Sequence, residues 1–260
     1  METYQQQFQY YALVTGGTSG IGYELAKLLA QDGNDLILVA RNANELISVS
    51  RELMMQYGVD VVTYSKDLLD PENAVALYRE IRSRKIHVDI LINDAGYEQY
   101  GELPDMSIRK ELDIINLNIS SLVVLTKLFL KDMMERKSGK ILNISSIASK
   151  SPGLWQSVYC GTKAFVQSFT EAIRNETKNT GVTITAMLPG TTDTEFFRKA
   201  ELSDSKIHQH RKLAIPAEVA KDAYIALMDG DGIVVSDYKN PVMNNIIPGV
   251  KHTDKIKKYI

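Results

Sequence analysis

The chain has 260 residues, with 30 Lys and Arg against 32 Asp and Glu, which gives a formal net charge of −2. This length allows one large α/β domain, and this balance of charge implies neither a nucleic-acid-binding surface nor a strongly acidic partner surface. The single cysteine, Cys160, excludes a disulfide within the chain and suits a reducing compartment.

The amino-terminal segment METYQQQFQYY has no basic stretch followed by an apolar run, so we expect no secretory signal. We also expect no apolar stretch that reaches the roughly 18–20 residues of a membrane span. These patterns favour a cytoplasmic protein with neither a nucleic-acid nor a membrane partner.

Short β-branched runs alternate with longer helical patterns along the whole chain. Strands are predicted at 11–15, 35–40, 60–65, 89–93, 140–145, 183–188 and 232–235, with helices at about 21–32, 43–57, 71–84, 107–136, 156–179 and 216–229. Most of the strands are nearly continuous apolar runs, which is typical of strands buried on both faces of a parallel sheet. We therefore expect one α/β domain over 1–260, with a Rossmann-like, doubly wound parallel sheet of about seven strands and helices on both faces.

A glycine-rich loop follows the first predicted strand and leads directly into a helix. Gly16, Gly20 and Gly22 would let this loop approach a pyrophosphate closely, and the helix start would offer free N–H groups to it. A structural tight turn is the alternative. The strand–loop–helix context favours dinucleotide binding.

The loop has the T-G-x-x-x-G-I-G pattern and so resembles the short-chain dehydrogenase/reductase family, a resemblance that extends from Tyr10 to about Pro248. It implies cofactor contacts from the loop residues Gly16, Thr18, Ser19, Gly20, Ile21 and Gly22. The second strand ends in Arg41-Asn42 and has no acid at the position where NAD enzymes bind the ribose hydroxyl. A guanidinium there can bind a 2′-phosphate, which favours NADP(H), although a solvated arginine is the alternative.

Two further segments match the cofactor path of the family. Asp67-Leu68 follows the third strand, and Asn93-Asp94-Ala95-Gly96 follows the fourth. The resemblance implies cofactor contacts from Asp67, Leu68, Asn93, Ala95 and Gly96, with Asp94 standing where the family usually has a second Asn. Either segment alone could be a plain turn at the end of a strand.

Tyr159 and Lys163 form a Y-x-x-x-K pair at the start of a predicted helix, on one helix face. A phenol titrates near pH ~10, and we expect the neighbouring cation to lower that pKa toward neutrality, where a general acid/base works best. The pair alone is weak evidence, since it occurs by chance in many helices.

Other residues complete the catalytic set that the resemblance implies. Ser146 stands thirteen residues before the tyrosine and is favoured over its neighbour Ser145, while Asn118 is favoured over Asn116 as the fourth member. In the family the serine binds the substrate oxygen and the tyrosine protonates it. The lysine binds the nicotinamide ribose and lowers the tyrosine pKa, and the asparagine holds a water relay.

Pro189, Gly190, Thr192 and Thr194 match the family motif after the sixth strand and are expected to contact the cofactor. A short substrate lid is expected at about 191–215, where the alternative is a surface excursion packed on the core. His208 and His210 have no supporting acid or cysteine, so we expect no metal site.

The resemblance implies an NADP(H)-dependent oxidoreductase that interconverts a small-molecule carbonyl and a secondary alcohol, as a homodimer or homotetramer. The alternative is a non-catalytic protein that senses NADP(H) on the same fold. Loss of the tyrosine or lysine usually marks that alternative, and both residues are present.

Overall fold

The computed structural model describes residues 9–150, 153–194 and 213–236. In this part of the chain the strands are β1 (Gln9–Thr15), β2 (Asp35–Ala40), β3 (Val61–Ser65), β4 (Ile86–Asn93), β5 (Gly139–Ile144), β6 (Val182–Leu188) and β7 (Ile233–Val235). The α-helices are α1 (Gly20–Gln31), α2 (Ala43–Tyr57), α3 (Pro71–Ser83), α4 (Ile108–Ile115), α5 (Leu122–Arg136), α6 (Ser157–Glu176) and α8 (Pro216–Asp229).

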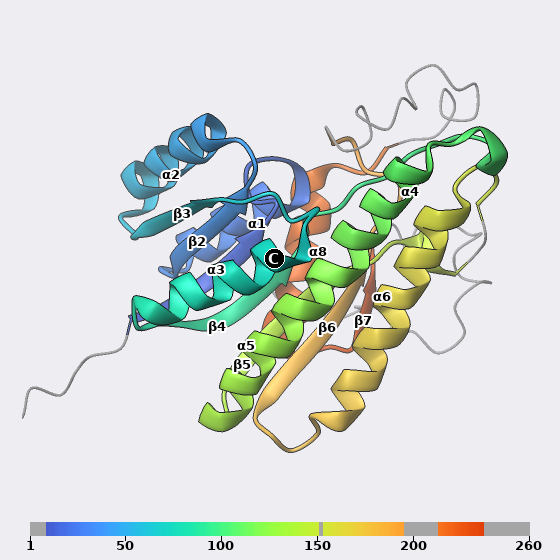
Figure 1. The fold of residues 1–260 in the computed structure, drawn as a ribbon. Helices are drawn as coiled ribbons and strands as arrows, with labels where there is room; N and C mark the ends of the chain where they lie inside the picture. Colours follow the sequence, from blue (N-terminus) through green and yellow to red (C-terminus); the bar gives the residue numbers. More distant parts are fainter. Residues whose placement is uncertain (1–8, 151–152, 195–212, 237–260) are drawn as a thin grey trace, which may run out of the picture.

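The strands form one parallel sheet in the order β3-β2-β1-β4-β5-β6-β7. The chain builds outward from β1 to β3, then crosses back to β4 on the other side of β1. Figure 1 shows helices on both faces of this sheet. The predicted doubly wound fold is confirmed, and such a reversal places a ligand site at the carboxyl ends of β1 and β4.

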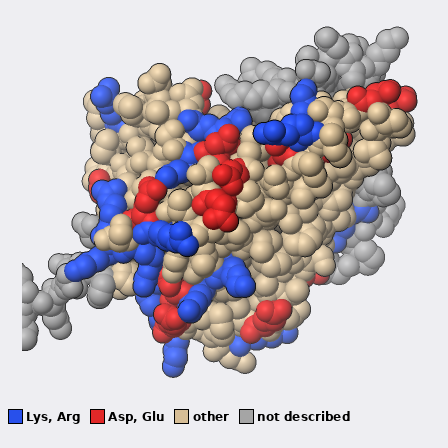
Figure 2. Space-filling model, in the orientation of Figure 1, with Lys and Arg blue, Asp and Glu red and all other residues tan. Residues whose placement is uncertain are grey.

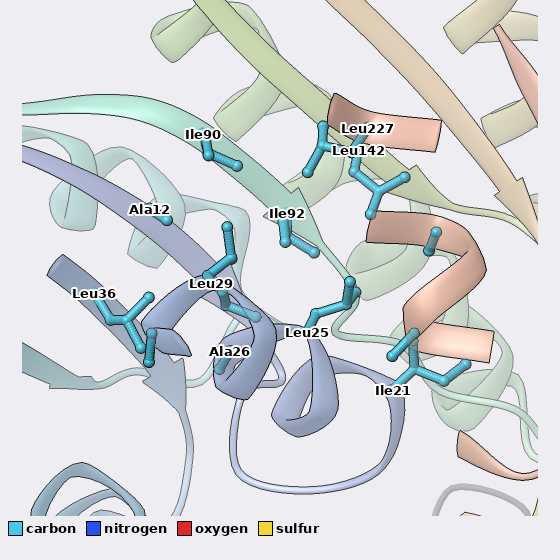
Figure 3. Close-up of a cluster of buried hydrophobic side chains, with 14 of the residues drawn as sticks. Ala12, Ile21, Leu25, Ala26, Leu29, Leu36, Ile90, Ile92, Leu142 and Leu227 are labelled. Carbon is cyan, nitrogen blue, oxygen red and sulfur yellow. The ribbon is translucent and has the colours of Figure 1, made fainter. Parts of the chain in front are cut away.

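One face of the sheet is covered by α1, α2 and α8. Leu25 and Leu29 of α1 are fully buried against Ile92 of β4 and Leu227 of α8 (Figure 3). These leucines are four residues apart, about one helical turn, so both lie on the face of α1 that packs against the sheet. This packing holds the start of α1 at the carboxyl edge of the sheet.

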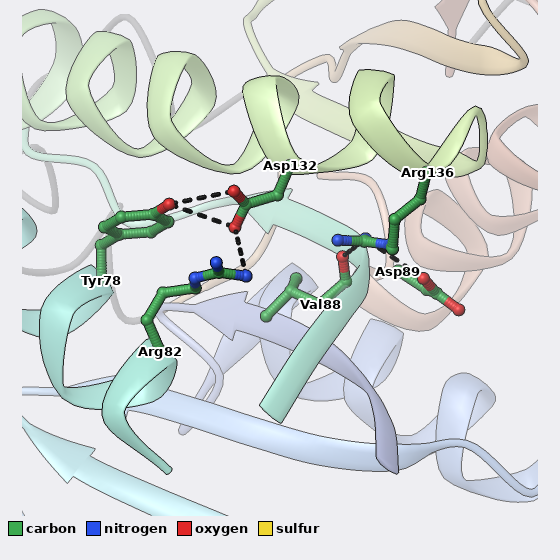
Figure 4. A network of polar contacts seen from close by, with 6 residues as sticks. All are labelled: Tyr78, Arg82, Val88, Asp89, Asp132 and Arg136. Carbon is green, nitrogen blue, oxygen red and sulfur yellow. Dashed lines mark hydrogen bonds and ion pairs between the residues drawn. The ribbon is translucent and has the colours of Figure 1, made fainter. Parts of the chain in front are cut away.

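The opposite face is covered by α3, α5 and α6, with Phe129 of α5 in its core. A polar network ties α5 to its neighbours at the margin of this core (Figure 4). Tyr78 of α3 donates to both carboxylate oxygens of Asp132 at 3.0 and 3.1 Å, and Arg82 lies 3.4 Å from the same carboxylate. Arg136 donates to the carbonyl of Val88 at 2.8 Å. These bonds satisfy groups that would otherwise lose hydration as α5 packs on the sheet.

The helix predicted over 107–136 is interrupted. The segment Asn116–Ser121 between α4 and α5 is a π-helix, a feature frequently found at functional sites.

The strand predicted over 140–145 also ends one residue early, at Ile144, so Ser145 and Ser146 both lie in the loop beyond β5.

The expectation that no apolar segment reaches span length is wrong. The helical stretch Ile108–Arg136 is long and apolar enough to cross a membrane by length and composition. Its residues Leu122, Leu125, Phe129 and Met133 are buried against the sheet. A core helix passes the same test, so this stretch gives no argument for a membrane.

Most of the lid expected at about 191–215 lies outside the described residues. Its two ends are described, and they meet. Thr192 and Ala214 form a parallel bridge, with the Asp193 N–H donating to the Ala214 carbonyl at 3.0 Å and the Ala214 N–H to the Thr191 carbonyl at 2.9 Å.

Candidate active site

The glycine loop has the geometry of a phosphate cradle. Gly16 and Gly20 have φ values of +73° and +59°, which L side chains rarely adopt. A Cβ on Gly22 would lie 2.6 Å from the carbonyl oxygen of Gly16. Ser19 precedes α1 without capping it through its side chain, so the first N–H groups of α1 lack that partner. The loop therefore fits a diphosphate at a helix N-terminus.

The segments after β4 and β6 lie against this loop. Thr15 accepts hydrogen bonds from the main-chain N–H groups of Asp94 and Ala95, each at 3.1 Å, which holds the segment after β4 beside the loop. Thr194 lies against Gly20, since a Cβ there would be 3.1 Å from its methyl carbon. Thr18 is partly exposed in the loop.

The side chain of Ile21 packs in the core, so only its main chain could contact a cofactor. The loop after β6 is fixed by two bonds. The Pro189 carbonyl accepts from the Ile147 N–H at 3.0 Å, and Thr192 donates to the Gly190 carbonyl at 2.9 Å. The segments after β1, β4 and β6 are thus held at the carboxyl edge of the sheet.

The predicted adenine-side residues lie at the ends of β2 and β3. Arg41 is exposed there, whereas the Asn42 side chain caps α2 by accepting from the N–H groups of Asn44 and Glu45. The Asp67 carboxylate accepts from the Leu69 N–H at 3.1 Å. The exposed guanidinium is therefore the group at this edge that has the chemistry for a 2′-phosphate.

Two residues of the predicted cofactor path have structural partners. Leu68 is buried, and its carbonyl accepts from Ser121 at 2.6 Å. The Asn93 side chain is also buried and donates to Thr126 at 3.0 Å and Asn143 at 2.8 Å. These contacts link the sheet to α5 and the π-helix. Only the main-chain atoms of Leu68 and Asn93 could therefore contact a cofactor. Gly96 is partly exposed directly after Ala95.

Three of the four predicted catalytic side chains meet beyond the end of β5. A hydrogen bond joins Ser146 to Tyr159 of α6. The ammonium of Lys163 lies 5.7 Å from the centre of the Tyr159 ring and donates to the Ile144 carbonyl at 2.9 Å. The i,i+4 spacing on α6 and the adjacent end of β5 together produce this arrangement.

The open choice between Ser145 and Ser146 is decided by their partners. Ser145 is buried and donates to the main-chain carbonyl of Lys163 at 2.7 Å. Ser146 begins the short 3₁₀ helix Ile147–Ser149, where its oxygen accepts from the Ala148 N–H at 3.1 Å, and it faces Tyr159. Ser146 is the serine of the cluster.

Asn118 lies in the π-helix and fixes the loop after β4. Its oxygen accepts from the Tyr97 N–H at 2.8 Å, and its nitrogen donates to the Tyr97 carbonyl at 2.9 Å and to Thr162 at 3.1 Å. Asn116 is partly exposed at the end of α4. The amide of Asn118 therefore joins the loop after β4 to α6.

The expectation that the cation next to Tyr159 lowers its pKa is wrong for the protein groups as they stand. Burial raises the pKa of Tyr159 above its ordinary value, the Glu98 carboxylate adds to this rise, and the Ser146 hydrogen bond opposes it. Low-dielectric surroundings disfavour the charged phenolate form. Tyr159 is therefore a phenol near neutral pH and has a proton to donate.

Two carboxylates share the surroundings of Lys163. Burial lowers the pKa of Lys163 to about 8, and the charges of Asp94 and Glu98 oppose this shift. Burial likewise raises the pKa of both Asp94 and Glu98 to about 7, against the attraction of Lys163. The site thus holds four buried groups whose charges affect one another's protonation, namely Asp94, Glu98, Tyr159 and Lys163.

Glu98 was not predicted from the sequence. Glu98 is 6% exposed. Its carboxylate accepts a hydrogen bond from Gln156 just before α6, and its charge raises the pKa of Tyr159. The sequence signal that could have identified it is its position, two residues after the Asn93–Gly96 motif that is expected beside the cofactor.

The buried Cys160 lies between Tyr159 and Lys163 in the sequence, and burial raises the pKa of its thiol. This disfavours a nucleophilic thiolate. Within the described ranges no group of three or more His, Cys, Asp and Glu side chains could hold a metal ion. His208 and His210 lie outside those ranges.

Comparisons with known proteins agree with this geometry. A family profile described as short chain dehydrogenase matches residues 10–204. The NADP-dependent 3-hydroxy acid dehydrogenase of Schizosaccharomyces pombe is 29% identical over 234 residues, which cover 86% of this chain and 89% of that protein.

Solved structures agree as well. A short-chain dehydrogenase from Sphingobium yanoikuyae in complex with NADPH has a TM-score of 0.81 and 25% identity, covering 95% of this chain and 99% of that one. An actinorhodin polyketide ketoreductase variant with NADPH has a TM-score of 0.78 and 28% identity, covering 88% and 95%. The chain belongs to the short-chain dehydrogenase/reductase family of oxidoreductases.

Proposed function

We propose that the protein is an NADP(H)-dependent oxidoreductase that interconverts a carbonyl and a secondary alcohol. The observation that carries this proposal is the cluster of Ser146, Tyr159 and Lys163, with its Ser146–Tyr159 hydrogen bond. The cluster lies beyond the end of β5 and beside the segment after β4, which is held against the phosphate cradle.

Each side chain has a role that its surroundings support. Tyr159 is held as a phenol and donates its proton to the substrate oxygen during reduction, while Ser146 orients that oxygen. The ammonium of Lys163 stabilises negative charge as the proton leaves. Asn118 positions the loop after β4, and its water relay remains a prediction. A bound nicotinamide would supply or accept the hydride.

The choice of NADP(H) is supported by Arg41, which is exposed at the end of β2. A guanidinium can hold a 2′-phosphate in two parallel hydrogen bonds, and the relatives described above bind NADP or NADPH. Arg41→Asp is expected to weaken NADPH binding at least about tenfold, since a charge-assisted contact is replaced by repulsion. Arg51→Asp, which changes an exposed arginine of α2, is the matched control. Unchanged NADPH affinity in Arg41→Asp would contradict the assignment.

The experiment that tests the reaction is a screen of purified protein for NADPH oxidation with a panel of ketones and aldehydes. We expect turnover with at least one carbonyl, and loss of that turnover in Tyr159→Phe with NADPH binding retained. Turnover by Tyr159→Phe near the wild-type rate would refute the role of the phenol. NADPH binding without turnover on any carbonyl would instead favour the NADP(H) sensor.

We further propose that the protein is a homodimer or homotetramer. Figure 2 shows a broad area without charged residues over α5 and α6. Phe165 of α6 is 40% exposed and stacks on Phe169 with ring centres 5.8 Å apart. Exposed aromatic side chains are enriched at protein–protein interfaces. A monomeric mass by light scattering at micromolar protein concentration would refute this proposal.

A further inference from the structure

Glu98 is a buried carboxylate placed among the groups proposed to react. It is 6% exposed, and its charge acts on Tyr159, Cys160 and Lys163 of α6. Lys163 forms no ion pair with it among the salt bridges of the described residues. Its hydrogen-bond donor is the neutral amide of Gln156. A buried carboxylate without a directly paired cation is costly to maintain, so it calls for a functional explanation.

The segment that carries Glu98 is fastened at three points. Asn118 holds both main-chain groups of Tyr97, Gln156 holds the carboxylate itself, and the Gly101 N–H donates to the Trp155 carbonyl at 3.0 Å. These bonds reach the π-helix and the residues just before α6. A carboxylate fixed in this way is preorganised, which is what selective recognition of a ligand group requires.

The residues before α6 are themselves held in an uncommon conformation. Trp155 has φ +63°, a value that non-glycine residues rarely adopt, and its ring meets that of Tyr100 edge-on at 5.4 Å. Backbone strain of this kind clusters at ligand-binding and catalytic sites.

We propose that Glu98, held by Gln156, is the specificity-determining residue of the reaction and binds a hydrogen-bond donor on the substrate, an ammonium or a hydroxyl group next to the reacting carbon. The proposal rests on the function proposed above. Above its pKa of about 7 the Glu98 carboxyl is ionised and only accepts hydrogen bonds, so it prefers a cation first, a hydroxyl second and a methyl group least. The carboxylate is held by Gln156, which directly precedes the helix that carries Tyr159. Its ligand group is therefore expected next to the carbonyl that Tyr159 protonates.

Three small ketones of nearly equal shape test the preference. Aminoacetone, hydroxyacetone and butanone carry an ammonium, a hydroxyl and a methyl group on the carbon next to the carbonyl. Each reduction consumes one NADPH and one proton and yields the alcohol and NADP⁺: the hydride goes to the carbonyl carbon and the Tyr159 proton to its oxygen. We expect kcat/KM to fall in that order, with aminoacetone at least about tenfold above butanone.

Variants assign the preference to the carboxylate. Glu98→Gln keeps the size of the side chain and removes its charge, so the ratio of kcat/KM for aminoacetone to that for butanone is expected to fall at least about tenfold. Gln156→Leu removes the group that holds the carboxylate and is expected to lower the same ratio less. The matched control is Glu111→Gln on α4, which changes another buried carboxylate with no charge effect on Tyr159. Circular dichroism and NADPH binding confirm that each variant is folded.

The outcomes separate the two proposals. Equal or better use of butanone by the wild-type protein, or a wild-type ratio in a folded Glu98→Gln variant, overturns the role of Glu98. Turnover of other ketones without turnover of any of the three also overturns it. Bound NADPH without turnover on any carbonyl refutes the proposed function itself.

Discussion

Replacing Asp94 with asparagine exchanges one carboxylate oxygen for an amide nitrogen and leaves the shape of the side chain nearly unchanged. The carboxylate accepts a hydrogen bond from the Gly22 N–H and interacts with the charge of Lys163. Burial nevertheless raises the pKa of Asp94 from 3.8 to about 7. The ionised form is therefore less stable in the folded protein than in the unfolded chain.

The sign of the pH dependence follows from these two pKa values. Between about pH 4 and pH 7 the folded protein keeps a proton that the unfolded chain has lost, so this residue makes stability fall as the pH rises. One pKa unit corresponds to about 1.4 kcal/mol, so the loss between pH 5 and pH 8 is about 2–3 kcal/mol. Asparagine does not ionise, and its oxygen can still accept from Gly22.

The assay is equilibrium unfolding in guanidinium chloride, followed by circular dichroism, for the wild type and Asp94→Asn at pH 5 and pH 8. We expect the variant's gain in free energy of unfolding over the wild type to be about 2–3 kcal/mol larger at pH 8 than at pH 5. Asp105→Asn is the control, because that exposed carboxylate is hydrated in both states. The same gain at both pH values would refute the reasoning.

Three other changes test the cradle, the core and the network. Gly22→Ala places a methyl group 2.6 Å from the carbonyl oxygen of Gly16, so NADPH affinity by fluorescence titration is expected to fall at least about tenfold; wild-type affinity would contradict the tight packing of the loop. Phe129→Ala empties a fully buried site and is expected to lower the free energy of unfolding by about 3–5 kcal/mol, whereas a loss below about 1 kcal/mol would argue against that burial. Asp132→Asn weakens the bonds from Tyr78 and is expected to cost about 1–2 kcal/mol in the same assay, with no loss if the network contributes nothing.

Much of the fold could be predicted because its signals are local. Proline after Asp70 starts α3, where Asp70 accepts from the Glu72 N–H. Continuous apolar runs identify strands covered on both faces. The π-helix that carries Asn118 could not be predicted, because the periodicity of the predicted helix 107–136 is uninterrupted in the sequence. It is apparent only from the backbone and from the bonds of Asn118 to Tyr97 and Thr162.

The candidate site divides in the same way. Three parts of the candidate site could be predicted because each depends on a pattern within one turn or one helix. They are the glycine loop, Arg41 after β2 and the i,i+4 pair Tyr159 and Lys163. The sequence favoured Ser146 over Ser145 by its spacing from Tyr159. The structure gives the physical reason, because Ser145 donates to the main-chain carbonyl of Lys163, whereas Ser146 forms a hydrogen bond with Tyr159. Asn93 fits the cofactor pattern, yet its side chain serves the core.

The sequence by itself therefore determined the class of fold, the phosphate cradle and the face of α6 that carries Tyr159 and Lys163, because short-range backbone geometry sets these spacings. Only the tertiary structure decided the electrostatics of that pair. Burial raises the pKa of Tyr159, and burial depends on packing by the whole chain. Glu98 contacts Gln156, which follows it by 58 residues in the sequence. No local sequence pattern predicts a contact over such a separation, so the buried carboxylate near Tyr159 is apparent only in the folded structure.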